Sequence, residues 1–272
     1  MAEADVIANY SSDAIVERIL AAVAANGATG PLTAEMLFPY DQLHGRELAA
    51  TREHIPRLGV QPSWRVLDIG SGIGGPARFI ASTTGAHVMG IDLTPALVQT
   101  ATELSGRVGL DALVQFEQGN AEAMPFEDRS FDAAICFYVG MNLPNKPAVL
   151  AEAHRVLKPG AKLLWTQVVS GSGDPIYPLP WAVSAAVSHV VSPEQLRQAM
   201  VDAGFAILDW ADETNAHVEL AKAGAATGMV PTQEHLSVLH VVLGEGFAER
   251  RMNYIRNLTS GAMRSVAVLA RA

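Results

Sequence analysis

A glycine-rich loop followed by an acidic residue is the part of the sequence with the clearest chemical meaning. Gly70, Gly72 and Gly75 follow a short apolar run and fit the dinucleotide pattern G-x-G-x-x-G. Such glycines let the backbone approach a ligand closely. Asp92, about 20 residues further on, can accept hydrogen bonds from ribose hydroxyls. The loop and this acid alone leave an NAD-dependent enzyme as an option.

A second acidic residue changes which ligand is expected. Asp68 lies two residues before the first glycine, at the end of the apolar run. A carboxylate there would repel a pyrophosphate, but an ammonium or sulfonium group would stabilise it. S-adenosylmethionine carries both of these cations, together with a ribose that Asp92 could hold. The two acids therefore favour S-adenosylmethionine over NAD, and the alternative to either is a plain tight turn.

The elements around the loop alternate between strand and helix. Apolar runs with β-branched residues are separated by segments of helical periodicity, which is typical of a parallel sheet with helices on both faces. We therefore expect an α/β fold with a seven-stranded, mostly parallel sheet. The expected strands are 65–69, 86–91, 113–118, 131–138, 162–169, 205–211 and 264–270.

The N-terminal part and two later segments depart from this alternation. Residues 13–25 have the apolar spacing of an amphipathic helix, and breakers follow them. We expect residues 1–58 to form a helical cap or lid. The core would then be residues 59–272, with cap insertions at about 170–191 and 213–260.

Composition restricts the partners and the surroundings of the protein. The chain has 19 Lys and Arg against 28 Asp and Glu, so a nucleic-acid partner is disfavoured. The single cysteine, Cys136, excludes an internal disulfide and fits a reducing compartment. The acidic N-terminus does not resemble a signal peptide, and no apolar stretch is long enough to span a bilayer. We expect a cytoplasmic, globular protein whose partner is a small molecule, and its oligomeric state stays open.

Four blocks of sequence resemble class I S-adenosylmethionine-dependent methyltransferases. They are VLDIGSGIGGPARFIA, GIDLT, GNAEAMPFEDRSFDAAICF and HRVLKPGAKLLW. The GGPAR ending and the earlier DQLHGRELAAT block resemble the branch that contains sterol, tocopherol and sarcosine/dimethylglycine methyltransferases. The resemblance implies a Rossmann-like class I methyltransferase fold. It also implies methyl transfer to an O, N or C nucleophile of a small-molecule acceptor.

The resemblance also implies which residues hold the cofactor. Gly70 and Gly72 would lie against its methionine part, Asp92 would hold the ribose, and Leu93 would pack on the adenine. The family usually has Asp where Asn120 stands, but Asn keeps a carbonyl acceptor for the adenine amino group. The full set expected at the cofactor is Gln42, Asp68, Gly70, Ser71, Gly72, Asp92, Leu93, Asn120, Ala121 and Phe137.

Methyl transfer needs few catalytic groups from the protein. Methyl transfer from a sulfonium needs orientation and desolvation, and a base only where the nucleophile arrives protonated. His44, in a polar cluster before the first strand, is the expected catalytic residue, with a helix-capping loop residue as the alternative. No spacing of His or Cys indicates a metal site. The expected acceptor-binding residues, each with packing or turn formation as its alternative, are Tyr10, Tyr138, Met141, Asn142, Tyr177, Trp181 and His189.

Three other functions fit part of these observations. A repurposed scaffold that binds S-adenosylmethionine and catalyses a non-methylating reaction such as cyclisation would keep the same blocks. An NAD(P)-dependent oxidoreductase is disfavoured by Asp68, and a non-catalytic binding protein by the complete set of cofactor blocks.

Overall fold

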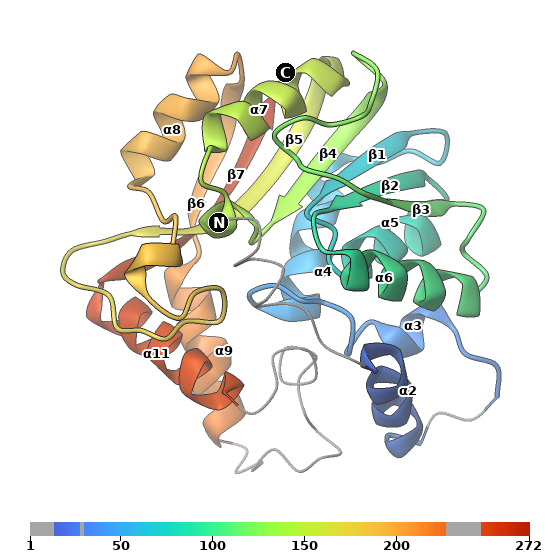
Figure 1. The fold of residues 1–272 in the computed structure, drawn as a ribbon, viewed down its shortest axis with the longest axis horizontal. Coiled ribbons are helices and arrows are strands. Elements are labelled where there is room, and N and C mark those ends of the chain that lie inside the picture. The colour runs from blue at the N-terminus through green and yellow to red at the C-terminus, as the bar shows by residue number, and fades with distance from the viewer. Residues whose placement is uncertain (1–13, 28–29, 227–245) are drawn as a thin grey trace.

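One seven-stranded sheet forms the centre of the molecule (Figure 1). The structure, a computed structural model, describes residues 14–27, 30–226 and 246–272 of the chain. The strands are β1 (Arg65–Ile69), β2 (His87–Asp92), β3 (Val114–Gln118), β4 (Phe131–Phe137), β5 (Leu157–Ser170), β6 (Ala206–Asp212) and β7 (Met263–Arg271). Their order is β3-β2-β1-β4-β5-β7-β6. Strands β1 to β5 are parallel, whereas β7 runs antiparallel to both β5 and β6. The expected fold class is confirmed.

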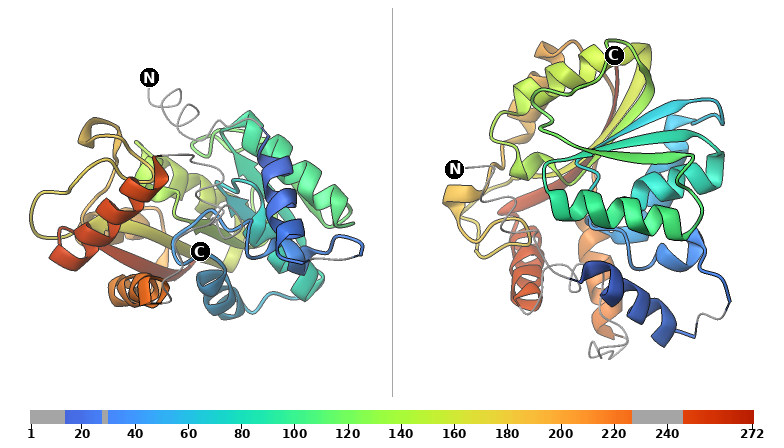
Figure 2. Two further views of the ribbon diagram at one scale, coloured as in Figure 1. Left: turned by 90° about the horizontal axis from the view of Figure 1, so that it is seen from below. Right: turned by 45° about the vertical axis from the view of Figure 1, so that its right-hand side comes forward.

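Helices pack on both faces of this sheet (Figure 2). Buried side chains of α4, α5 and α11 form one apolar core with the first face, and those of α7 and α8 form a second core with the other face. The helices are α2 (Ile15–Ala25), α3 (Ala34–Leu37), α4 (Glu47–Leu58), α5 (Gly75–Thr84), α6 (Pro95–Arg107), α7 (Lys146–Val156), α8 (Pro193–Asp202), α9 (Thr214–Ala226) and α11 (Phe247–Ser260). The amphipathic spacing of the N-terminal helix is confirmed, because the apolar face of α2 is buried.

The strand order reverses between β1 and β4, and this determines where a ligand can bind. The chain moves outward from β1 through β2 to β3, then returns to the other side of β1 as β4. At such a switch point the loops after the two central strands diverge and leave a crevice at their carboxyl ends. The glycine loop follows β1, and the short 3₁₀ helix η1 (Gly140–Asn142) comes shortly after β4. Both segments therefore border the crevice.

The N-terminal helices extend the molecule beside α6. Helices α2 and α3 share a third apolar cluster with Ile73 of the glycine loop and with Leu97 and Leu104 of α6. The left view of Figure 2 shows α2 lying alongside α6. The acceptor candidate Tyr10 lies outside the described residues. The division into a cap of residues 1–58 and a core of residues 59–272 stays a prediction.

The two expected insertions differ in character. Residues 170–191 have little regular structure beyond a short 3₁₀ helix η2 (Ala185–Val187). The described part of residues 213–260 is mostly helical and consists of α9 and α11, which pack on each other and on β7. Among the described residues, no helix is long and apolar enough to cross a membrane.

Candidate active site

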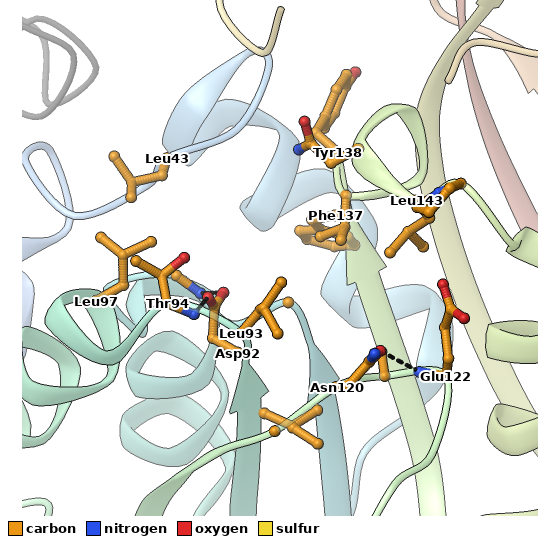
Figure 3. A pocket seen from close by; sticks show the side chains of 18 residues that line it. Leu43, Asp92, Leu93, Thr94, Leu97, Asn120, Glu122, Phe137, Tyr138 and Leu143 are labelled. Carbon is orange, nitrogen blue, oxygen red and sulfur yellow. Dashed lines mark hydrogen bonds between the residues drawn. The ribbon is translucent and has the colours of Figure 1, made fainter. Parts of the chain in front are cut away.

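A cavity of about 900 Å³, counted with its open mouth, lies at the carboxyl ends of the central strands (Figure 3). Its wall comes from the glycine loop, the start of α6, the loop after β3, and the segment that follows β4. This is the crevice that the strand order predicts. Predicted cofactor residues that line it are Gly70, Gly72, Asp92, Leu93, Asn120, Ala121 and Phe137.

The glycine loop needs the backbone freedom of glycine at its first position. Gly70 has φ +71°, and a Cβ atom there would lie 2.3 Å from Cγ2 of Val139. The backbone N–H groups of Gly70 and Ser71 both donate to the carbonyl oxygen of Ile91, at 2.8 and 3.1 Å. The loop is therefore fixed against β2 and the segment after β4, and its backbone forms part of the cavity wall.

Asp92 joins the glycine loop to the start of α6. Its Oδ2 accepts a hydrogen bond from the Gly72 N–H at 2.8 Å, and its Oδ1 accepts one from the Thr94 N–H at 2.9 Å. Burial raises the pKa of this carboxyl, and these backbone hydrogen bonds oppose the shift. Each carboxylate oxygen keeps a second acceptor position. Asp92 can therefore receive ligand hydroxyl groups from a fixed position in the wall.

Asp68 lies on β1 beneath this wall without lining it. The residue is 2% exposed, and its Oδ2 has no hydrogen-bond partner among the described residues. Burial first, and then the negative charge of Asp92, raise the pKa of Asp68 to about 8, while Arg78 opposes the shift. A buried carboxyl with an unused oxygen is a good partner for a cationic group. Ser71 does not line the cavity either, because its side chain packs on Gly90 of β2.

The loop after β3 provides polar groups on one side of the cavity. Asn120 Oδ1 accepts a hydrogen bond from the Glu122 N–H at 2.8 Å (Figure 3). This contact fixes the plane of the amide in a wall that the apolar side chain of Leu93 also lines. An amide with a fixed plane next to an apolar surface can bind the edge and face of a flat heterocycle.

The segment before α4 closes another side of the cavity, but through Leu43 and not through the polar residues on either side of it. Gln42 is fully buried behind the cavity wall. His44 is 4% exposed, with Nε2 lying 2.9 Å from Thr51 Oγ1 and Nδ1 lying 3.1 Å from the Gly45 carbonyl oxygen. Burial lowers the pKa of His44 to about 4, so the imidazole is neutral at pH 7. It does not line the cavity, and its catalytic role stays a prediction.

The acceptor candidates separate into two groups. Tyr138 and Asn142 line the cavity. The others in the described part of the chain do not, because Met141, Tyr177 and Trp181 pack in the apolar core of the first sheet face, and the His189 N–H donates to the Met141 carbonyl at 2.9 Å. The geometry thus gives a packing role to Met141 after β4 and to Tyr177, Trp181 and His189 of the insertion. Their predicted contact with an acceptor stays a prediction.

A buried polar network behind Tyr138 was not expected from the sequence. The Tyr138 hydroxyl lies 2.6 Å from His217 Nε2 and 2.7 Å from Ser265 Oγ. Burial and the charge of Arg46 lower the pKa of His217 to about 3, and burial raises the pKa of Tyr138 well above 10. Both groups are therefore neutral at pH 7. They come from the ends of three distant segments, so spacing in the sequence gave no signal for the network.

A neighbouring group of side chains has the composition of a metal site. The ligand atoms of Glu53, His54 and Glu213 lie within 4.8 Å of one another. However, the Arg46 guanidinium forms ion pairs with both carboxylates, and His54 Nε2 lies 2.9 Å from Glu213 Oε1. The arginine already supplies the positive charge that a metal would bring.

Comparison with known proteins finds similarity to methyltransferases. Residues 67–165 match the family model described as a methyltransferase domain. The chain is 38% identical over 124 residues to a sterol 24-C-methyltransferase of Gibberella zeae, covering 45% of this chain and 33% of that protein. It is 29% identical over 188 residues to phosphoethanolamine N-methyltransferase 1 of Zea mays, covering 69% of this chain and 37% of that protein. The chain spans about a third of the length of the curated relatives it matches.

Solved structures share the fold over nearly the whole chain. A geranyl diphosphate C-methyltransferase from Streptomyces coelicolor A3(2), in complex with S-adenosyl-L-homocysteine, has a TM-score of 0.72 at 17% identity, covering 99% of this chain and 97% of that one. The [4+2]-cyclase SpnF has a TM-score of 0.66 at 24% identity, covering 94% and 93%. Residues 67–165 thus match a methyltransferase domain, and the sheet has the Rossmann-like fold of class I S-adenosylmethionine-dependent methyltransferases, which this chain resembles. Its relatives in sequence are enzymes named for small molecules, sterols and phosphoethanolamine among them.

Proposed function

We propose that this protein transfers a methyl group from S-adenosylmethionine to a small-molecule acceptor. One observation carries the proposal: two carboxyl groups flank the glycine loop at the switch point of the sheet. Asp68 is buried with an Oδ2 that has no hydrogen-bond partner among the described residues, and Asp92 lines the cavity. This arrangement suits a ligand that has a cationic end and a ribose. A pyrophosphate offers no cationic group to pair with Asp68, so it suits the arrangement less well.

The remaining residues of the wall support the same ligand. Asp92 would accept hydrogen bonds from the ribose hydroxyls, and Asp68 would face the ammonium group. Leu93 and Leu97 offer an apolar surface to the adenine, with the Asn120 amide near its edge. The close approach of the backbone at Gly70 and Gly72 leaves room for the methionine part.

The protein's own contribution is to orient the reactants and exclude water. S-adenosylmethionine, when bound, supplies an electrophilic methyl group on a sulfonium. Leu43, Phe137 and Leu143 line the cavity with apolar surface, which limits solvent at the reacting atoms. Tyr138 is held by hydrogen bonds and stays protonated at neutral pH, so it orients its neighbours and does not act as a base.

The charge of the wall supports an acceptor with an apolar body. Among the described residues that line the cavity, the charged ones are Asp92 and Glu122, and none is Lys or Arg. A phosphate ester would meet negative charge without a compensating cation, at a cost that grows as water is excluded. An uncharged or cationic acceptor fits better than a phosphorylated one.

The amino-acid composition supports a cytoplasmic compartment and a small-molecule partner for this reaction. The single cysteine is buried and fits a reducing, cytoplasmic compartment. A net charge of −9 supports small-molecule partners over nucleic acids.

Transfer of labelled methyl groups tests the proposal. The protein is incubated with methyl-labelled S-adenosylmethionine and either an extract of host metabolites, a panel of apolar alcohols, amines and alkenes, or phosphoethanolamine. We expect label in an apolar product and an equal amount of S-adenosylhomocysteine. Tight binding of the donor without label in any fraction would contradict methyl transfer and would favour a repurposed scaffold. Label in phosphoethanolamine alone would contradict the assignment of the acceptor class.

A further inference from the structure

A buried ion pair between Arg78 and Asp41 joins helix α5 to the segment before α4. Arg78 lies on α5, directly after the glycine loop, and Asp41 lies between α3 and α4. Both side chains are completely buried. The Arg78 Nε and Nη2 groups donate to the same Asp41 oxygen, at 3.1 and 2.9 Å. Ion pairs of this kind contribute little net stability, because desolvation offsets their attraction.

The guanidinium has no freedom to move. Besides the two bonds to Asp41, its Nη2 donates to the Ile73 carbonyl at 2.7 Å, and its Nη1 donates to Ala101 O and Ser105 Oγ at 3.3 and 3.2 Å. All five N–H donors of an arginine are thus used. Arg78 is fixed to the glycine loop and to α6 at the same time. Lysine could not reproduce this planar arrangement.

The bonds continue from Asp41 into the segment before α4. Gln42 Nε2 donates to the second Asp41 oxygen at 2.6 Å, and Thr51 Oγ1 donates to Gln42 Oε1 at 2.6 Å. Backbone contact is equally close, because a Cβ atom at Gly75 would lie 2.1 Å from the Asp41 carbonyl oxygen. The segment is therefore held from α5 on one side and from α4 on the other.

The residue that this anchoring presents to the cavity is Leu43. It lines the cavity, and its Cδ1 lies 3.4 Å from the position that a Cβ atom at Gly72 would occupy (Figure 3). The neighbours of Leu43 in sequence point away into the polar network. Leu43 thus covers the glycine loop only while Gln42 and His44 stay in the polar network and leave Leu43 facing the cavity.

We infer that Arg78 is a positioning residue for the cofactor: through Asp41 it fixes the segment that places Leu43 over the glycine loop. The inference rests on the proposed function, because it concerns the same cavity. It explains why the ion pair is present although its burial contributes little stability. Arg78 does not line the cavity, so its effect on ligand affinity must pass through the segment.

The test measures the affinity for S-adenosylhomocysteine by calorimetry in four proteins besides the wild type. They are Arg78→Met, Leu43→Ala, the double variant, and Met200→Ala as a control. Met200 is fully buried on α8 in the core of the opposite sheet face, so its truncation lowers the Tm without disturbing the segment. We expect about tenfold weaker binding for either single variant at the cavity. The double variant should be no weaker than the weaker single variant, and the control should match the wild type.

Amide hydrogen exchange of residues 41–45 gives a readout that needs no ligand. Arg78→Met should speed exchange there, while Met200→Ala should not. If Arg78→Met is too unstable to study, Arg78→Lys and Asp41→Asn weaken the same anchor more gently and should show the same pattern.

The outcomes separate the inference from the proposed function. A wild-type protein that does not bind S-adenosylhomocysteine would contradict the proposed function, and the positioning role with it. Normal wild-type binding with equal affinity in Arg78→Met would overturn only the positioning role. The positioning role would also be overturned if the fold-losses in affinity of the two single variants multiplied in the double variant. Arg78 and Leu43 would then act independently.

Discussion

Binding of a ligand with an ammonium group should release a proton from Asp68. The carboxyl is 2% exposed, and its Oδ2 has no partner within the described part of the chain. Because burial and Asp92 raise its pKa to about 8, roughly nine in ten molecules carry the proton at pH 7. A positive group placed beside Asp68 lowers that pKa, and the proton then leaves.

The expected size of the effect follows from this pKa. Between pH 6 and 7 the release should approach one proton per ligand, so affinity should rise by up to about tenfold per pH unit. The stability of the unbound protein depends on pH in the opposite direction, because it falls as the pH rises. A raised pKa in the folded state adds stability that is fully present below the unfolded value of 3.8 and is lost as the pH rises through about 8.

Calorimetry in two buffers measures the released protons directly. S-adenosylhomocysteine is titrated at pH 6.5 in buffers with small and large ionisation enthalpies, and the slope of the observed enthalpy gives the proton number. Asp68→Asn keeps the shape of the side chain and should reduce the slope to near zero. Equal slopes in the wild type and the variant, or a zero slope with tight binding, would refute the role of Asp68 as the partner of the ammonium group.

Three further predictions concern single residues. Asp92→Ala should weaken binding of S-adenosylhomocysteine by about 1.5–3 kcal/mol, the range for hydrogen bonds to a charged group, with the fold intact by circular dichroism. His44→Ala should lower the Tm but leave the shape of the pH–rate profile unchanged between pH 5 and 8, because the pKa of His44 is about 4; an inflection lost in the variant would contradict this. Gly70→Ala should destabilise the protein by about 1–3 kcal/mol in urea unfolding, because its Cβ would collide with Val139; Val139→Ala in the same chain should recover part of the loss.

The sheet was accessible from sequence because its signals are local. Buried parallel strands are short apolar runs, and each is followed by glycine, proline or a helical period. The start of β5 could not be predicted from the sequence, because Lys158, Pro159 and Gly160 have the composition of a turn. In the structure, β5 begins at Leu157, which pairs with Phe131, and the Gly160 N–H donates to the carbonyl of Ala272 at 2.7 Å. Pairing with the distant C-terminus extends the strand through residues that would otherwise end it.

In the site, too, residues with a local sequence signal could be predicted and contacts between distant residues could not. Gly70, Gly72 and Asp92 were predictable because residues close in sequence, at the ends of neighbouring strands, carry the signal. The contact between Tyr138 and His217 joins residues 79 positions apart, and no spacing rule reaches that far. The same holds for the partnership between Arg78 and Asp41, although both blocks were visible in the sequence.

A paired titration shows whether the cavity at the glycine loop binds S-adenosylmethionine in preference to a dinucleotide. Wild-type protein is titrated with S-adenosylhomocysteine and, separately, with NAD⁺ under the same conditions. We expect saturable binding of one S-adenosylhomocysteine per chain and no detectable heat of binding with NAD⁺. Saturable binding of NAD⁺ without binding of S-adenosylhomocysteine would contradict this expectation.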